Sequence, residues 1–530
     1  MKRLIPALLL LSLVFGYFIG LYVTNSNRPV IDNSGNKLDY VLNVIDAKYV
    51  DQPNIQEIIE KGIPKIIAEL DPHSAYIPQK EMAAINEDLH GSFSGIGIRF
   101  TIQEDTIHIG EVIHGGPSEQ AGLLAGDRII TVNDTTFVGK GVCTNDAAVK
   151  KLKGPKGSFV KLGVLRYGDK NLHHFNIRRD DVIIKSIESA YLIDNKWGYI
   201  QVERFGENTY SEFMQSALTL AGKYAHGFII DLRGNGGGYL EIAYEMANQL
   251  LKKDEMIVYT EGRQNPKREF KADGNGMLVN YPVVILVDET SASASEILAG
   301  AIQDNDRGTV IGRRTFGKGL VQEQIPLEDG SALRLTVARY YTPSGRCIQK
   351  PYTNGEGEKY ALELIDRYNR GEFFNADSIQ LDKSLEFKTK KGRTVYGGGG
   401  IMPDIFIPSD TTLATNYASE VLSKGHVAQF ALKYATAKRQ ALSKHTTYPA
   451  LLGELKKEQL LNEFVKFAEE KGIARNNEEI QTSREFLEKS IHGSIIYHLL
   501  NMNEYTKFNN VDDPAILKAV EILNNGQSYP

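Results

Sequence analysis

Cysteine is scarce in this sequence: Cys143 and Cys347 are the only two among 530 residues. Two cysteines are too few for a scaffold of disulfides or for a zinc site built from cysteine ligands. They could still form a single disulfide with each other. At a usual length of about 100–200 residues per domain, the chain predicts three or four domains.

The sequence also lacks an excess of charge of one sign. It has 61 basic and 66 acidic side chains, which give a formal net charge of −5. This balance gives no indication of nucleic-acid binding, which usually needs a basic surface. Hydrophobic residues make up 42% of the chain and charged residues 24%, so the composition is that of an ordinary globular protein.

Histidine is missing from a long central stretch, because none of the eleven histidines lies between Asp231 and Asp410. Histidine is the usual general base for a nucleophilic serine. A serine in this stretch therefore has no histidine nearby in the sequence. A distant histidine could still fold into the site, so the absence weakens a serine–histidine triad without excluding it.

The N-terminus carries the one long apolar segment of the sequence. After Lys2 and Arg3, the residues Leu4–Val23 contain no charge and are numerous enough to span a bilayer as a helix. The basic flank should stay cytoplasmic, so the rest of the chain should lie outside. A cleaved signal peptide is the alternative. We favour an uncleaved anchor within residues 1–28, because no A-x-A-like cleavage site follows, and the absence of a following cysteine argues against a lipoprotein.

The pattern of the sequence changes three times beyond the anchor. Short amphipathic helices are predicted for residues 29–88, a β-rich unit for 89–180, alternating strands and helices for 181–410, and helices for 411–530. The last region has apolar faces that must pack on something. It could cover the preceding domain, mediate a homodimer or bind an activating adaptor.

Three serines alternate with alanine in "DETSASASEILAGAIQD", after a buried strand and before a helical pattern. Two interpretations are open. Ser293 and Glu296 have the spacing of a capping box, which would make the serine a helix cap. A residue at such a strand-to-helix turn also lies where helix amides can stabilise an anion, which suits a nucleophile.

A lysine is the alternative base for such a serine, and Lys318 lies between two glycines in "RRTFGKGLVQ". Making it half neutral at pH 7 means lowering its pKa from about 10.4 to about 7, which costs about 4.6 kcal/mol. Desolvation can supply that much. Upstream, "DLRGNGGGYL" places a glycine loop after a buried strand, where backbone amides could approach a developing anion. A tight turn is the other interpretation of that loop.

The segments "GSFSGIGIRF" and "AGLLAGDRIITVN" together resemble a PDZ domain. Gly95, Ile96, Gly97 and Ile98 stand where that family has its carboxylate-binding loop. Ser118 stands where the family often has alanine. The resemblance implies a β-rich domain that binds the C-terminal tails of proteins or peptides.

Over residues 38–410 the chain resembles the C-terminal processing peptidases, also called tail-specific proteases. The motifs are "LDPHSAYIP", "DLRGNGGGYL", the serine triplet, "RRTFGKGLVQ" and "GGGGIMPDI", in this order. The resemblance implies that Ser293 is the nucleophile, Lys318 the base and Gln322 the residue that orients the lysine. It implies oxyanion donors at Ala294 and at Gly237 or Gly238.

The expected fold is multidomain α/β, with a crotonase-like (ClpP/crotonase-type) protease core, a β-rich PDZ domain and helical N- and C-terminal regions. The expected function is a serine endopeptidase, anchored at the inner membrane, that cleaves proteins with free apolar C-termini in the bacterial periplasm. The resemblance implies no metal and no organic cofactor. One alternative is a PDZ scaffold with an inactive core, against which the intact Ser293, Lys318 and Gln322 argue. The other is an acyl-transforming enzyme of the crotonase type, which would bind coenzyme A.

The polar stretch Thr353–Gly397 lies between two of these motifs and is rich in Lys, Glu and Asn. It is predicted to be a surface insertion, and its sequence indicates no specific function.

Overall fold

The computed structural model describes residues 37–410 and 415–526, which fall into two compact units, one ending at Leu70 and one beginning at Asp71. In the first unit, α2 (Lys37–Lys48) and α3 (Ile55–Ala68) are helices without a buried residue. The predicted anchor lies outside the described residues. Among the helices that are described, none has the length and apolarity to cross a membrane.

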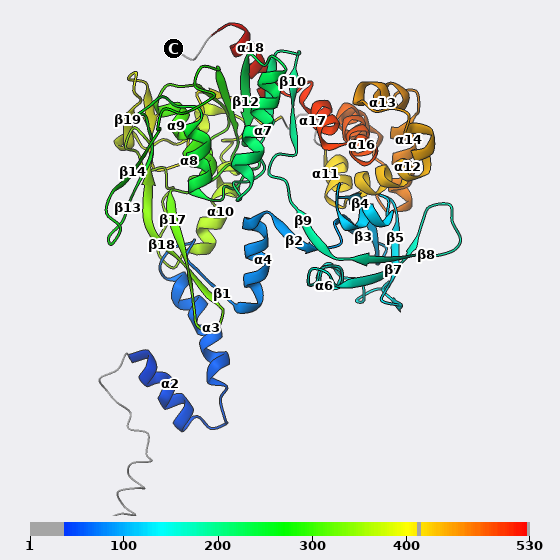
Figure 1. The fold of residues 1–530 in the computed structure, drawn as a ribbon, viewed down its shortest axis with the longest axis horizontal. Helices are drawn as coiled ribbons and strands as arrows, with labels where there is room; N and C mark the ends of the chain where they lie inside the picture. The colour runs from blue at the N-terminus through cyan, green and yellow to red at the C-terminus, as the bar shows by residue number, and fades with distance from the viewer. Residues whose placement is uncertain (1–36, 411–414, 527–530) are drawn as a thin grey trace, which may run out of the picture. The chain divides into compact units, whose positions relative to one another are not determined.

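The second unit contains a six-stranded sheet at its centre (Figure 1). Its strands follow the order β10 (Ser189–Ile193), β11 (Trp197–Gln201), β12 (Gly227–Asp231), β15 (Val283–Val287), β16 (Thr309–Gly312) and β21 (Ile405–Phe406). The first pair is antiparallel and all the others are parallel. The strands β12, β15 and β16 are buried along their whole length, as expected for a parallel sheet covered on both faces.

Helices cover both faces of this sheet, and alternate residues of each strand pack against the helices on opposite faces. One face packs on α7 (Thr209–Gly222), α8 (Leu240–Asn248) and α9 (Ala294–Asp304), with Ile230 and Ile285 in the shared core. The other face packs on the C-terminal helix α18 (Pro514–Asn524), with Ile229 and Leu286 in the shared core. Neighbouring strand residues thus point to opposite cores, as the pleat of a strand requires.

A second, antiparallel sheet contains β1 (Ala75–Ile77), β18 (Ala332–Tyr341), β13 (Met256–Glu261), β14 (Arg268–Lys271) and β17 (Leu320–Pro326). β1 lies in the stretch for which only helices were predicted, and it is followed by α4 (Gln79–His90). Three residues are too few for the alternation of a strand to be recognised in a sequence. β1 pairs with one edge of β18, and β17, which carries Gln322, pairs with the other edge.

The predicted PDZ domain forms a sheet in the order β3 (Ile98–Gln103), β4 (Thr106–Val112), β5 (Arg128–Val132), β7 (Phe159–Leu165) and β8 (His173–Arg178), with β6 (Thr135–Thr136) beside β5. Two helices, α5 (Pro117–Ala121) and α6 (Asn145–Leu152), accompany it. Beside this sheet, β2 (Ser92–Gly95) pairs with β9 (Asp180–Ile183), a strand that extends across the domain boundary predicted at residue 180. β3 is the end strand of its sheet, so one of its edges is open.

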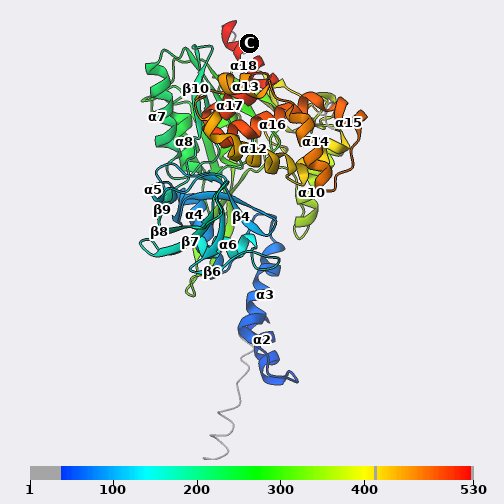
Figure 2. The same cartoon turned by 90° about the vertical axis from the view of Figure 1, so that its right-hand side faces the viewer.

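The C-terminal helices form a core of their own around residues such as Phe464 and Ile491. They are α11 (Asn416–Ser423), α12 (His426–Leu442), α13 (Tyr448–Leu455), α14 (Leu460–Glu470), α15 (Asn477–Thr482), α16 (Arg484–Leu499) and α17 (Met502–Asn510). α12, α14 and α16 lie side by side (Figures 1 and 2).

This helical region contacts both preceding domains. The Tyr497 hydroxyl donates to the Glu111 carboxylate of β4 at 2.8 Å, and Ala190 N of β10 donates to Asn503 Oδ1 at 2.8 Å. The region is expected to cover the preceding domain, mediate a homodimer or bind an adaptor. Of these three roles, the structure shows the first, because the region packs on the rest of the chain. The disulfide considered above does not form, because Cys143 and Cys347 are both free.

The packing of α18 leads to a stability prediction. Ile516 is 2% exposed against the sheet, whereas its neighbour Leu517 is 53% exposed. Ile516→Ala should lower the free energy of unfolding by about 2–5 kcal/mol, because it leaves a cavity on the sheet face. Leu517→Ala is the matched control and should change it by less than about 0.5 kcal/mol. Urea unfolding measures both, and equal effects of the two changes would contradict the packing described.

Candidate active site

Ser293 lies at a sharp turn between β15 and α9, with a φ of 55° and a ψ of −114°. A residue other than glycine rarely has a positive φ, and this combination of φ and ψ also lies outside the small left-handed helical region. Such a conformation costs about 1–3 kcal/mol and persists only where the surroundings impose it. Strained strand-to-helix turns of this kind present a nucleophilic serine at the carboxyl end of a sheet.

The three alternating serines have different environments. The hydroxyl of Ser291 donates to Leu232 O at 2.8 Å, and that of Ser295 donates to Asn235 O at 2.9 Å. Both side chains are fully buried, and both fasten the glycine loop to the serine turn. Ser293 is half-buried, and its hydroxyl makes no capping hydrogen bond. Of the triplet, Ser293 alone has a hydroxyl with no hydrogen-bond partner among the described residues.

Glu296 stands in the capping-box arrangement that its spacing from Ser293 predicts. Its carboxylate accepts from Ser293 N at 2.8 Å. It also accepts from Thr315 Oγ1 at 2.5 Å, Gly317 N at 2.8 Å and Lys318 N at 2.9 Å. The side chain is fully buried, and burial raises the pKa of Glu296 to about 7 against the opposing effect of these donors. One carboxylate thus holds the backbone of the serine turn and that of the lysine loop together.

Lys318 lies in surroundings that favour the neutral form of its side chain. Burial lowers the pKa of its side chain, and the positive charge of Arg334 lowers it further, while Glu296 and Asp71 act in the opposite direction. Its Nζ donates to Gln322 Oε1 at 3.1 Å. Among the described contacts, no hydrogen bond joins Nζ to the Ser293 hydroxyl. Catalytic hydrogen bonds are often long in an enzyme without substrate, so the missing hydrogen bond does not exclude proton transfer between Ser293 and Lys318.

Tyr340 gives the serine and the lysine a second common anchor. Its buried hydroxyl lies within hydrogen-bond distance of both Ser293 O, at 3.1 Å, and Lys318 O. Sequence reasoning did not single out Tyr340. Its only signal is a tyrosine in a strand, which is too common to suggest a role.

His73 is the distant histidine that folds close to the site. Its backbone carbonyl accepts from Gln322 Nε2, and its ring Nε2 lies 2.8 Å from the Tyr360 hydroxyl. Burial lowers the pKa of His73 to about 4, with a further contribution from the charge of Lys318. No hydrogen bond joins the imidazole to Ser293 in the described part of the chain. His73 therefore contacts Gln322 through its backbone, and its ring is neutral near pH 7.

The glycine loop lies directly against the serine turn. A Cβ on Gly237 would lie 2.8 Å from Ser293 Cβ, and one on Gly238 would lie 2.2 Å from Phe205 O, so only glycine fits at either position. The N–H of Gly237 is engaged, because it donates to Asn235 Oδ1 at 2.8 Å. The N–H groups of Gly238 and Ala294 have no partner among the described residues.

The predicted carboxylate-binding loop lies between β2 and β3. Gly97 has a φ of 75°, which favours glycine, and a Cβ there would meet Pro117 Cδ at 3.3 Å. Ile96 is buried in the domain core, and its carbonyl accepts from Ser118 N at 2.9 Å. Gly95 ends β2 and Ile98 begins β3. The loop therefore leads directly into the open edge of the sheet.

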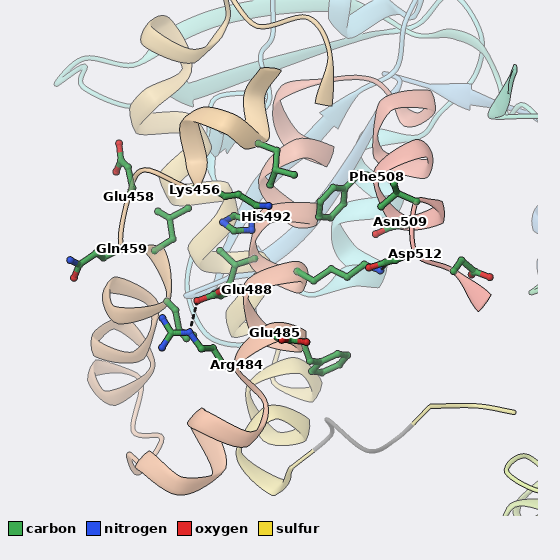
Figure 3. A pocket seen from close by; sticks show the side chains of 18 of the residues that line it. Lys456, Glu458, Gln459, Arg484, Glu485, Glu488, His492, Phe508, Asn509 and Asp512 are labelled. Atoms are coloured by element: carbon green, nitrogen blue, oxygen red, sulfur yellow. Dashed lines mark hydrogen bonds and ion pairs between the residues drawn. The ribbon is translucent and has the colours of Figure 1, made fainter. Parts of the chain in front are cut away.

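A large cavity lies elsewhere, among α13, α14, α16 and α17 (Figure 3). It has a volume of about 1110 Å³ and is lined by charged side chains such as Lys456 and Glu485. Arg484 Nε and Glu488 Oε1 form an ion pair of 3.0 Å at its wall. None of the candidate catalytic residues is among the described residues that line it, so the cavity belongs to the helical C-terminal region.

Comparison with known proteins assigns a class to this arrangement. Residues 196–355 match Peptidase family S41, residues 87–165 match the PDZ domain, and residues 417–501 match a family of unknown function. The chain is therefore a serine-type protease that carries a PDZ domain and a helical C-terminal region.

The similar proteins make the family more specific. The carboxy-terminal-processing protease of Bartonella bacilliformis is 36% identical over 310 residues, which cover 58% of this chain and 70% of the relative. The carboxy-terminal processing protease CtpA of Bacillus subtilis is 34% identical over 370 residues, covering 68% and 78%. A solved photosystem II D1 C-terminal processing protease is 25% identical, covers 70% of this chain and 92% of its own, and has a TM-score of 0.36. The chain belongs to the carboxy-terminal processing proteases.

The hydrogen bonds of Glu296 lead to a prediction about both stability and activity. Each carboxylate oxygen of Glu296 accepts from two of the four donors. In Glu296→Gln the side-chain NH₂ would therefore face two donors, and at least one N–H would lose its acceptor. The free energy of unfolding should fall by about 1–3 kcal/mol. Hydrolysis should fall as well, because the serine turn and the lysine loop lose their shared partner. Glu358→Gln, on an exposed glutamate, is the control. Wild-type stability and wild-type kcat in Glu296→Gln would contradict this role.

Proposed function

We propose that the chain is a serine endopeptidase that works with a Ser293–Lys318 dyad and selects substrates by their C-terminal tails. The observation that carries the proposal is the pair of shared anchors, Glu296 and Tyr340, which hold a strained serine beside a lysine whose pKa burial lowers. A core on a crotonase-like (ClpP/crotonase-type) scaffold is part of the proposal, supported by the parallel sheet with its serine at the carboxyl end.

In the proposed reaction, neutral Lys318 takes the proton of the Ser293 hydroxyl as the oxygen attacks the substrate carbonyl carbon. The resulting oxyanion receives hydrogen bonds from Ala294 N and from an amide of the glycine loop. Gly238 is the better candidate for the second donor, because the Gly237 amide already donates to Asn235. Protonated Lys318 then gives its proton to the leaving amine, and water hydrolyses the acyl-enzyme.

Gln322 is the proposed orienting residue. Its carboxamide oxygen accepts one N–H of the Lys318 amine at 3.1 Å. A neutral amine that donates one N–H to Gln322 still has its lone pair, which points away from that N–H. The proposal needs that lone pair to face the Ser293 hydroxyl.

Substrate selection is proposed to begin at the PDZ domain. The loop Gly95–Ile98 would turn its amides to the terminal carboxylate of a protein, and the open edge of β3 would pair with the extended tail. Apolar C-terminal residues suit such a site. A homodimer or an activating adaptor could add to this selection.

The location of the enzyme is proposed from its sequence. An uncleaved anchor within residues 1–28 would hold the chain at the inner membrane, with residues 29–88, 89–180, 181–410 and 411–530 as the N-terminal helical region, PDZ domain, protease core and C-terminal helical region outside the cytoplasm. Its substrates would then be periplasmic proteins.

The dyad is tested by two inactive variants and one active control. Ser293→Ala and Lys318→Arg should both abolish hydrolysis of a casein substrate, the second because a guanidinium stays protonated. Ser295→Ala removes a structural hydrogen bond and should keep part of the activity. Because only the neutral amine is active, the wild-type rate should rise with pH along one limb whose midpoint lies below 10.5, the ordinary pKa of lysine. Activity in Lys318→Arg, or loss of wild-type activity in EDTA, would exclude the mechanism.

Tail recognition is tested with a peptide that ends in a free apolar residue and its C-terminally amidated twin. Amidation removes the charge that the Gly95–Ile98 loop would bind, so KM should rise while the scissile region stays the same. Gly97→Leu should cause a similar rise, and the two losses should not add. Gly115→Leu is the matched control, since Gly115 has the same φ of 75° but open space around it. Equal cleavage of both peptides by the wild-type enzyme would rule out tail recognition.

A further inference from the structure

The insertion Thr353–Gly397 contributes one long helix, α10 (Gly357–Asn369), whose sides are reversed relative to an ordinary surface helix. Its buried residues are Tyr360 and Arg367, whereas Leu362 and Ile365 are 53% and 55% exposed. A helix usually buries its apolar side and exposes its polar one. Buried polar groups need hydrogen-bond partners, so Tyr360 and Arg367 on the inner side of α10 must find them in the rest of the domain.

Arg367 contacts the loop that carries Lys318. Its guanidinium donates to Arg314 O at 2.6 Å and to Thr315 O at 3.0 Å. Its charge is compensated by Glu372, which also belongs to the insertion and accepts from Arg367 Nε at 3.1 Å. Thr315 is the residue whose hydroxyl donates to Glu296. Arg367 of the insertion thus holds the backbone of the lysine loop, whereas Glu296 accepts from the side chain of Thr315.

Tyr360 reaches the same site from about two turns earlier on α10. Its hydroxyl lies 2.8 Å from His73 Nε2 and 3.2 Å from Gln349 Nε2. Gln349 in turn accepts from Gly319 N, the residue after Lys318, at 2.8 Å. Tyr360 therefore contacts Gln349, which holds the residue after Lys318, and His73, whose carbonyl holds Gln322.

His73 links Tyr360 to the orienting glutamine. The His73 carbonyl accepts from Gln322 Nε2, which leaves Gln322 Oε1 to face Lys318 Nζ. A carboxamide can present either an acceptor or two donors to its neighbour. The position of the His73 carbonyl decides between them here, and the ring of His73 is held by Tyr360.

We propose that Tyr360 is a positioning residue for the catalytic base, acting through His73 and Gln322 on Lys318, and that the insertion exists in part to supply it. This inference rests on the proposed Ser293–Lys318 dyad. The charged groups that face Lys318 are Arg334, Glu296 and Asp71, and none of them comes from the insertion. Tyr360 therefore acts by geometry rather than by charge.

Tyr360→Phe in the full chain tests the inference, because it removes one hydroxyl and keeps the ring. After titration of active sites, kcat should fall about tenfold or more, and KM should stay within about twofold, since misplacing the base affects chemistry and not binding. The acid limb of the kcat profile should move to higher pH, because a lysine that is no longer held in its buried position regains hydration. A role limited to folding would lower the number of active sites and leave kcat per site and the limb unchanged.

The controls separate this inference from the dyad itself. Tyr352→Phe removes a hydroxyl from a tyrosine whose ring lies 6.4 Å from that of Tyr360, and it should behave as wild type. In a Gln322→Ala background, Tyr360→Phe should cause no further loss of kcat. Wild-type kcat and acid limb in Tyr360→Phe, or losses that multiply in the double variant, would overturn the inference. Lys318→Arg is measured beside them: if it is inactive, such a result rejects the positioning role alone, and if it is active, the dyad and the inference fail together.

Discussion

The buried carboxylate of Glu296 is the constraint on which the candidate site depends. It accepts hydrogen bonds from the serine turn and from three groups of the lysine loop, at 2.5–2.9 Å. Burying a carboxylate is costly unless its hydrogen-bonding capacity is used fully, and here it is. A single side chain thereby fixes two segments that follow adjacent strands of the parallel sheet. The strained backbone of Ser293 persists because one of these hydrogen bonds holds its N–H.

Part of this arrangement could be predicted from the sequence. The motifs implied Ser293, Lys318 and Gln322 as a group, and the structure places the lysine Nζ 3.1 Å from the Gln322 oxygen. The capping pattern identified the pairing of Ser293 with Glu296, but gave the glutamate a local role. Periodicity identified many strands and helices because the spacing of apolar residues is a local property of the sequence.

The remainder depends on contacts between distant segments. His73 and Gln322 are separated by 249 positions in the sequence, and no local pattern connects them. β1 is three residues long and is a strand only because β18 pairs with it. The insertion appeared to be a polar surface segment, since its composition does not reveal that Tyr360 and Arg367 turn inward. Tertiary packing decides such roles, and a single sequence does not record it.

The open edge of β3 has a consequence beyond the proposed binding of tails. Unpaired backbone groups on a sheet edge attract any extended chain, including unfolded proteins and other copies of the same domain. The pairing of β3 with β4 shifts register between Arg99 and Phe100, where β4 has the extra residue Gly110. Arg99 carries a charge that pairs with Glu111 and Glu188. A bulge and a charge are devices by which natural sheets keep their edges from aggregating. The charge on β3 and the bulge beside it therefore disfavour pairing of this edge with other copies of the same domain.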